Sequence, residues 1–190
     1  MNYVITEAPK AEPISLEEAK AHLRVDGEDE DALISGLIKA ARNYAENYTN
    51  RAFVTQTITA YLDFFPARYC IELPKPNLQN VVHIKYYDSD NAEHTFSSDN
   101  YFVDDISFVG RVALNYGKSW PSFTPRRVNA VEIEYVAGYG DAVKVPESIK
   151  QAMLLLVGHW YHNREAEGQV GKELEFSVKA LLNLERVINV

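Results

Sequence analysis

The fold is decided by residues 131–161, which read VEIEYVAGYG at 131–140 and DAVKVPESIKQAMLLLVGHWY at 141–161. In the first part, apolar residues alternate with glutamates, which is the two-residue period of a half-buried strand. In the second part, Pro146 suits the first turn of a helix, and apolar residues then occupy nearly every side of it from 149 to 161. The chain therefore changes from strand to helix at the turn Gly138-Tyr139-Gly140. A helix that is apolar all round needs cover all round, and we expect another subunit to supply part of it.

The residues before the strand region predict two helices. Ser15 and Glu18 have the spacing of a capping box, so a short helix is expected from 16 to about 23. The acidic run at 26–31 has the composition of a calcium loop, but its oxygens are not in register for an EF-hand. A loop leading into a helix N-terminus is the favoured interpretation. A longer helix follows from about 30 to 48, and its apolar side chains form one stripe: Leu33, Leu37, Ala41, Tyr44 and Tyr48, widened by Ile34, Ile38 and Ala45.

The residues between these helices and the helix at 149–161 have the period of strands. We expect strands at about 57–64, 69–73, 80–87, 93–96, 101–104, 108–114 and 130–135, and a last short helix from Ser177 to Val187. The fold class is therefore α+β, with a helical framework of two N-terminal and two C-terminal helices and a β-sheet insertion between them. The expected organisation is an N-terminal arm and helices (1–53), a β-rich insertion (54–140), and C-terminal helices that complete the helical domain (141–190).

Composition restricts the function classes. The 190 residues carry 19 Lys plus Arg against 27 Asp plus Glu, a formal net charge of -8. An acidic protein repels phosphate, so it is not expected to sequester DNA, although it suits a surface past which DNA slides. Cys70 is the only cysteine, which excludes a disulfide within the chain and favours a small buried apolar side chain. No signal-peptide pattern and no apolar run long enough to span a bilayer are present, so we expect a soluble protein that is made where it works, with no membrane partner.

No residue set predicts catalysis, a cofactor or a metal. His159, His162 and Glu165 have a spacing that could present ligands to a metal, but the HExxH arrangement is absent and a packed helix is the favoured interpretation. The segment 117–127 mixes cations with aromatic residues. It is open to three interpretations: a grip on single-stranded nucleic acid, a protein contact anchored by Trp120 and Arg126, or a plain loop between strands, which is favoured.

Two series of residues share an order with a known family. The first is LEEAKAHLRV at 16–25, DALI at 31–34, and the helix that continues to Thr49-Asn50-Arg51. The second is VEIEYVAGYG at 131–140, VP at 145–146, IKQA at 149–152 and HWYHNRE at 159–165, with Leu181-Leu182 near the close. Together they resemble the head–tail connector (adaptor) family of tailed bacteriophages and prophages.

This resemblance implies a non-enzymatic structural protein of the virion neck. It implies a homo-oligomeric ring of about twelve subunits below the portal protein, which extends the DNA channel and receives a stopper or tail-completion protein. DNA would pass through without specific binding. Trp160, Tyr161 and Arg164 are then expected at or near subunit contacts, and the terminal helix, with Leu181 and Leu182, is expected to engage the portal.

Two alternatives remain open at this stage. One is a neck or tail-completion subunit of the same particle, which would bind on the tail side and not to the portal. The other, from a different class, is a small enzyme or nucleic-acid accessory protein with a site in the β region.

Overall fold

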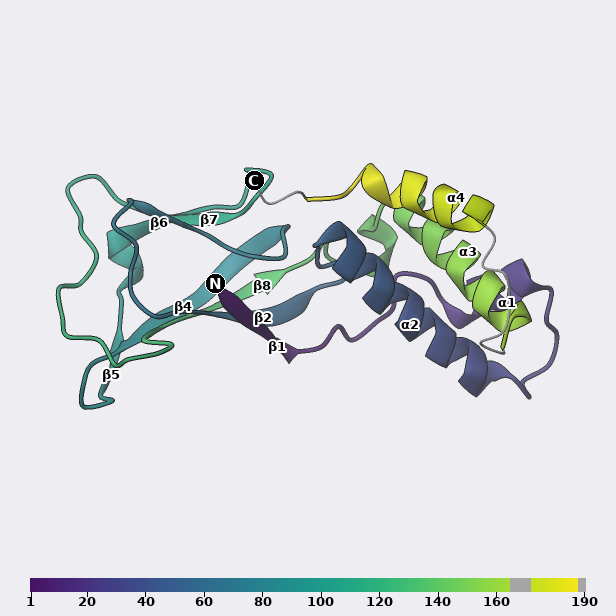
Figure 1. The fold of residues 1–190 in the computed structure, drawn as a ribbon, viewed down its shortest axis with the longest axis horizontal. Coiled ribbons are helices and arrows are strands. Elements are labelled where there is room, and N and C mark those ends of the chain that lie inside the picture. The colour runs from purple at the N-terminus through teal and green to yellow at the C-terminus, as the bar shows by residue number, and fades with distance from the viewer. Residues whose placement is uncertain (165–171, 188–190) are drawn as a thin grey trace. The chain divides into compact units, whose positions relative to one another are not determined.

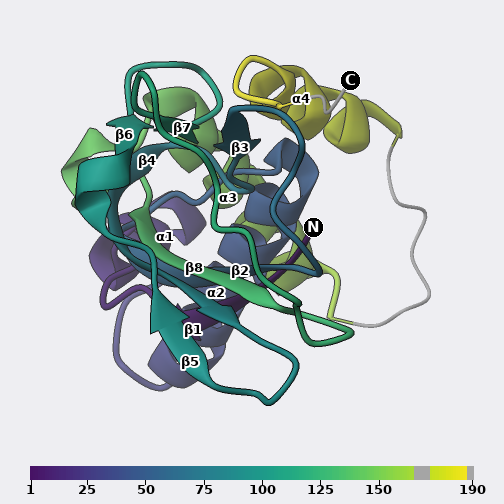
Figure 2. The ribbon, with the colours of Figure 1, turned by 90° about the vertical axis from the view of Figure 1, so that its left-hand side faces the viewer.

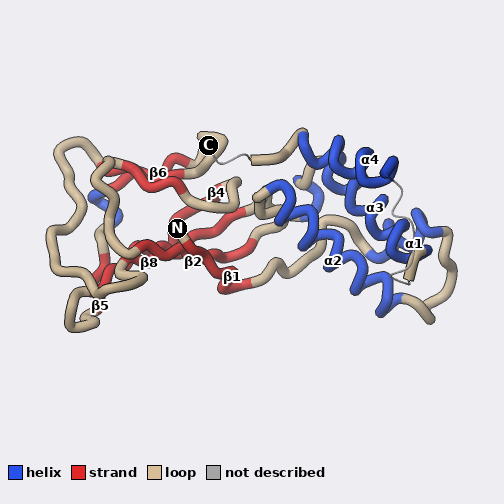
Figure 3. The backbone as a smooth tube through the Cα atoms, viewed as in Figure 1, coloured by secondary structure: helices blue, strands red, loops and turns tan. Residues whose placement is uncertain are grey.

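The computed structural model describes residues 1–164 and 172–187 and has an α+β fold, as the sequence predicts. Helices and strands separate into two compact units (Figure 3). The sheet unit comprises Met1–Lys10 and Thr55–Gly138, and the helical unit comprises Ala11–Val54 and Tyr139–Val190. The chain thus enters the sheet unit twice, and its first ten residues belong there and not with the helices.

The helical unit holds α1 (Leu16–Leu23), α2 (Asp31–Thr49), α3 (Glu147–His162) and α4 (Lys172–Asn183). The expected capping box begins α1: the Glu18 amide donates to Ser15 Oγ over 3.1 Å, and the Ser15 amide donates to the Glu18 carboxylate over 2.6 Å. The acidic run at 26–31 is a loop and the first residue of α2, as expected. A 3₁₀ turn at Ala142–Lys144 leads into α3.

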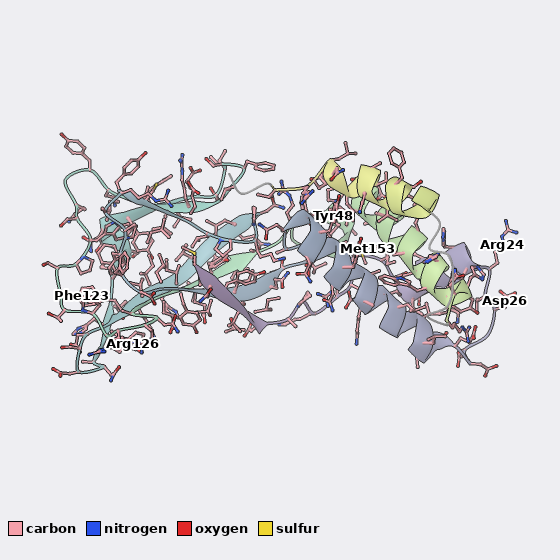
Figure 4. The ribbon with its side chains drawn as sticks, viewed as in Figure 1. Arg24, Asp26, Tyr48, Phe123, Arg126 and Met153 are labelled. Carbon is pink, nitrogen blue, oxygen red and sulfur yellow. The ribbon has the colours of Figure 1, made fainter. Side chains whose placement is uncertain are left out.

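The core of the helical unit lies around α3, which is placed between α2 and α4 (Figure 1). Its fully buried members come from all the helices and include Ile34, Ala41, Ile149, Met153 and Leu182. Figure 4 shows Met153 on α3 in this setting. The neighbouring helices of the same chain leave no large apolar residue of α3 exposed, so most of the cover expected from another subunit is supplied within the chain.

The apolar stripe of α2 is rotated relative to the expected one. Ile34 and Ile38, expected at its margin, are buried, whereas Leu33 and Tyr44, expected at its centre, are 38% and 39% exposed. Ile34 and Ile38 belong to one buried cluster with residues of α1, α3 and α4, so this side of α2 faces the core.

The sheet unit contains two antiparallel sheets. The five-stranded sheet has the order β1-β2-β8-β4-β5, from β1 (Asn2–Glu7), β2 (Gln56–Leu62), β8 (Val131–Ala137), β4 (Leu78–Tyr87) and β5 (Glu93–Thr95). The second sheet has the order β3-β7-β6, from β3 (Cys70–Glu72), β7 (Arg111–Leu114) and β6 (Tyr101–Asp104). A 3₁₀ turn at Ser98–Asn100 leads into β6. Figure 2 shows the smaller sheet as a layer beside β4, β8 and β2.

The core of the sheet unit lies between the two sheets. β8 alternates as predicted, with Val131, Ile133 and Tyr135 buried and the intervening glutamates half-buried. The Tyr135 hydroxyl donates to the Pro74 carbonyl over 2.6 Å, which satisfies a polar group inside this core. Cys70 is buried, as predicted.

The main difference from the expected elements is at the N-terminus. The segment expected as an extended arm forms β1, which pairs antiparallel with β2 so that Asn2 lies opposite Tyr61. All six residues of β1 are exposed, so it lacks the buried-exposed alternation that identifies a strand in a sequence. No helix of the described residues is long and apolar enough to cross a membrane.

Candidate interaction surfaces

Tyr161 and Arg164, at the end of α3, are both bonded to Glu30 at the start of α2. Arg164 Nη2 donates to Glu30 Oε1 over 2.5 Å, and the Tyr161 hydroxyl donates to the other oxygen of the same carboxylate. The guanidinium carbon of Arg164 also lies 4.7 Å from the centre of the Tyr161 ring. The hydrogen bond from Tyr161 and, to a smaller extent, that from Arg164 lower the pKa of the Glu30 carboxyl. The two residues therefore join α3 to α2 within the chain, and their role in a subunit contact stays a prediction.

Trp160 belongs to a row of aromatic side chains across α3 and α2. Its ring meets that of Tyr44 edge to face with centroids 6.2 Å apart, and Tyr44 stacks on Tyr48 at 6.3 Å. The row continues to α4, because the Tyr48 hydroxyl donates to Asn183 Oδ1 over 2.9 Å and Arg186 lies over the Tyr48 ring. Figure 4 marks Tyr48 on α2. Half-buried aromatic rows that carry polar tips are suited to protein contacts, and the assignment of Trp160 to a subunit contact stays a prediction.

The two leucines of α4 have different positions. Leu182 is fully buried in the core of its own unit, so its assignment as a partner contact is corrected: no surface of its side chain is left for a partner. Leu181 is half-buried and packs against the same core.

The outward side of α4 has an apolar stripe that the sequence reading missed. Phe176 is 76% exposed and Leu184, just beyond the helix, is 74% exposed, with exposed Ala180 midway between them. This spacing of four residues places them on one side of a helix. The four-residue spacing is visible in the sequence, but the expected helix began at Ser177, so Phe176 was left outside it. The observed helix begins five residues earlier and ends at Asn183, while Val187 is buried and its amide donates to the Thr49 carbonyl.

Trp120 lies in an aromatic cluster that holds the long loop between β7 and β8. It stacks on Phe65 with centroids 5.0 Å apart, and its indole N–H donates to the Arg68 carbonyl over 2.9 Å. Phe123 of the same loop also contacts Phe65, and Figure 4 marks it with Arg126 in this part of the sheet unit. These contacts agree with the favoured interpretation of a loop between strands.

Arg126 is likewise engaged within the chain. Its guanidinium carbon lies 4.0 Å from the centre of the Tyr87 ring, and its Nε donates to the carbonyls of Val128 and Asn129. The other two cations of the segment 117–127, Lys118 and Arg127, are exposed. These contacts fix the conformation of the loop, and its exposed cations give it a weakly basic surface.

The open face of the five-stranded sheet is polar and internally paired. His83 lies between Glu132 and Glu134, with Nε2 3.4 Å from a Glu132 oxygen and Nδ1 3.8 Å from a Glu134 oxygen. Lys85 pairs with Glu93 over 3.0 Å. Burial and the nearby Glu132 raise the pKa of Tyr87 to about 12. The carboxylates on this face therefore have partners within the sheet, and their contacts form a stabilising network on a solvated surface.

Metal-ligating residues do not gather in the described part of the chain: no group of three His, Cys, Asp or Glu side chains there could hold an ion. His159 Nδ1 lies 3.2 Å from the Asn163 side-chain nitrogen at the end of α3. Glu165, the third residue of the spacing noted in the sequence, lies outside the described residues.

The fold and these surfaces define an α+β protein with exposed aromatic and apolar side chains. The sequence profile of the head completion protein family matches residues 12–180, a span that includes both units, and the chain belongs to that family. The family resemblance drawn from the sequence is thereby confirmed. No curated protein matches the chain.

Solved structures share the fold over the whole chain. A chain in the neck of an empty GTA particle, computed with C6 symmetry, matches with a TM-score of 0.85 and 21% identity. A chain in the neck of a native GTA particle, computed with C12 symmetry, matches with a TM-score of 0.82 and 22% identity. A chain in the virion of a native gene transfer agent (GTA) particle matches with a TM-score of 0.82 and 21% identity. Each match covers 100% of this chain and 97% of the other.

Proposed function

We propose that this protein is a head–tail connector (adaptor) subunit of a phage-like particle. Copies of it form a ring of about twelve below the portal protein, and the ring extends the DNA channel and receives a stopper or tail-completion protein. The observation that carries the proposal is the match to the head completion family across residues 12–180, together with a shared fold over the full length of chains from particle necks. The protein works in the host cytoplasm during assembly and in the virion neck thereafter, as a structural protein without a cofactor.

The ring symmetry is supported by the neck to which one of the matching chains belongs, which was computed with C12 symmetry. The surface chemistry of this chain is compatible with a channel wall. Its net charge of -8 opposes retention of DNA phosphates, since DNA affinity rests mainly on cationic contacts. DNA then passes the ring without being held.

The portal-facing element is α4. Its inner side is fixed to its own unit by Val178 and Leu182, which are 2% and 0% exposed, and its outer side carries the exposed Phe176 and Leu184. A helix with one side buried in its own bundle and an apolar stripe outside can occupy a hydrophobic groove of a partner. We take the portal as the partner of this terminal helix, because the apolar stripe supplies a contact surface.

The test is to mix the protein with the portal protein of the same genome and to measure the mass of the complex by native mass spectrometry. The proposal predicts about twelve added copies per portal ring. Folded protein that adds no mass to the portal would contradict it, and binding to tail proteins alone would favour the tail-completion alternative.

Two matched variants sharpen this test. Phe176→Glu with Leu184→Glu places charges on the outer stripe and is expected to abolish addition to the portal with unchanged circular dichroism. Val143→Glu is the control, because Val143 is 85% exposed in the same unit but lies away from α4 in the 3₁₀ turn before α3. Equal binding by both variants would remove α4 from the portal contact.

A further inference from the structure

The outermost strand of the five-stranded sheet, β1, offers an apolar edge. It pairs with β2 on one side, and in the described part of the chain the strand order ends there. Val4 and Ile5 are 56% and 43% exposed. The outer edge of such a strand turns main-chain N–H and C=O groups away from the sheet, and an exposed apolar edge of this kind is a template for pairing with a strand of another chain.

The opposite edge of the same sheet is protected by its chemistry. β5 has only three residues, and Glu93 and His94 place charge or polarity there, with Glu93 paired to Lys85 over 3.0 Å. Short, charged edge strands resist the addition of a further strand. Of the two edges, β1 is therefore the one built to accept a partner.

The second exposed apolar surface of the sheet unit is at β6. Phe102 on this strand is 62% exposed, and Ile106 in the loop that follows is 92% exposed. β6 is the outermost strand of the smaller sheet, with β7 on its other side. It therefore also has an edge for main-chain pairing.

The two surfaces lie on opposite sides of the sheet unit. β6 lies against β4, whereas the segment after β3, at the other end of the smaller sheet, lies against β1: Lys75 Nζ is 5.9 Å from the Tyr3 ring centre. A closed ring is built from heterologous contacts, in which two different surfaces of each copy meet. Opposite placement of two strand edges on one unit satisfies this geometric requirement.

We propose that β1 of one copy pairs with β6 of the next copy, so that strand addition between sheet units joins neighbours in the ring. The inference rests on the proposed ring and names its subunit contact. The occupant of the β1 edge is a strand, because only a strand satisfies a row of main-chain donors and acceptors. A second copy of this chain carries such a strand on the side that the ring requires.

The test uses cysteine pairs, which the chain permits because its single cysteine is buried. In a Cys70→Ala background, Val4→Cys and Phe102→Cys are introduced together, and the assembled protein is treated with a short bismaleimide. The inference predicts a ladder from dimer up to the closed ring for the double variant. After the same treatment, each single variant gives no covalently linked species, and a mixture of the two single variants gives covalent dimers and nothing larger.

The control is Val4→Cys with Thr95→Cys, which probes pairing between β1 and β5 and is expected to give no ladder. Dimers from Val4→Cys alone would show symmetric β1–β1 pairing and overturn the inference. A ring of unchanged mass in which the Val4/Phe102 pair does not crosslink would also overturn it while leaving the proposed function intact. Absence of any ring would instead refute the proposed function, and the subunit contact with it.

A second measurement does not depend on crosslinking. Val4→Lys places a charge on the exposed β1 edge, where it is not expected to affect folding, and should abolish ring assembly. His94→Lys on β5 is the matched control and should assemble as the wild type does. Normal assembly of Val4→Lys, with its fold verified by circular dichroism, would contradict the inference.

Discussion

Truncation of Met153 to alanine should destabilise the helical unit by about 3 kcal/mol, within a range of roughly 2–5 kcal/mol for buried methionine and leucine. Met153 is 0% exposed on α3, where α2 and α4 pack on either side, so the space left by its thioether chain cannot fill without movement of a helix. For a unit of about one hundred residues, this loss corresponds to a decrease in Tm of roughly 10 °C or more.

The chain has two tryptophans, and one lies in each unit, which gives the assay its resolution. In a Trp120→Phe background, the fluorescence of Trp160 reports unfolding of the helical unit in urea. Met153→Ala should move the midpoint of this transition to lower urea. Val143→Ala, at an 85% exposed position of the same unit, should change stability by less than about 0.5 kcal/mol. A loss below about 1 kcal/mol for Met153→Ala would refute the placement of α3 at the centre of the helical unit.

Three further outcomes are expected. Tyr135→Phe removes the hydroxyl of a buried side chain that donates to the carbonyl of half-buried Pro74 over 2.6 Å, and should cost about 1–2 kcal/mol in the urea transition reported by Trp120; a change near zero would show that this carbonyl is satisfied without it. Ser15→Ala removes the capping box of α1 and should cost about 1 kcal/mol in the transition reported by Trp160, whereas Asn43→Ala, at an exposed position of α2, should change little. The hydroxyl and amide of Ser107, with Arg111, lower the pKa of Asp104 from 3.8 to about 2. The stability that this carboxylate contributes is therefore present above about pH 4 and is lost as the pH falls through about 2. The difference in urea midpoint between wild type and Asp104→Asn should shrink over that window, and a constant difference would contradict the assignment.

The helices and most strands could be predicted because each carries its signal locally. The capping box begins α1 as predicted, and the alternation in β8 agrees with its buried positions. β1 could not be found in this way, because all its residues are exposed and its strand identity comes from main-chain pairing with β2, more than fifty residues away. Pairing at such separation leaves no periodic pattern in the segment itself.

Which apolar side chains stay exposed could be predicted less completely, for a physical reason. Periodicity indicates that one side of a helix is apolar, but not which apolar residues its neighbours leave uncovered. The over-apolar α3 is covered by its own chain, while α4, with the weaker signal, leaves Phe176 and Leu184 exposed. For Trp120 and Arg126 the sequence favoured a plain loop between strands over a partner contact, and their side chains do hold a loop within the sheet unit.

The most direct test of the central claim is a cryo-EM reconstruction of the neck of particles produced from the genome that encodes this protein. The account predicts density for this chain in a ring of about twelve copies between the portal and the tail, with the α4 outer stripe against the portal. Particles whose head–tail junction is complete without this chain, or in which it lies elsewhere in the virion, would contradict the account.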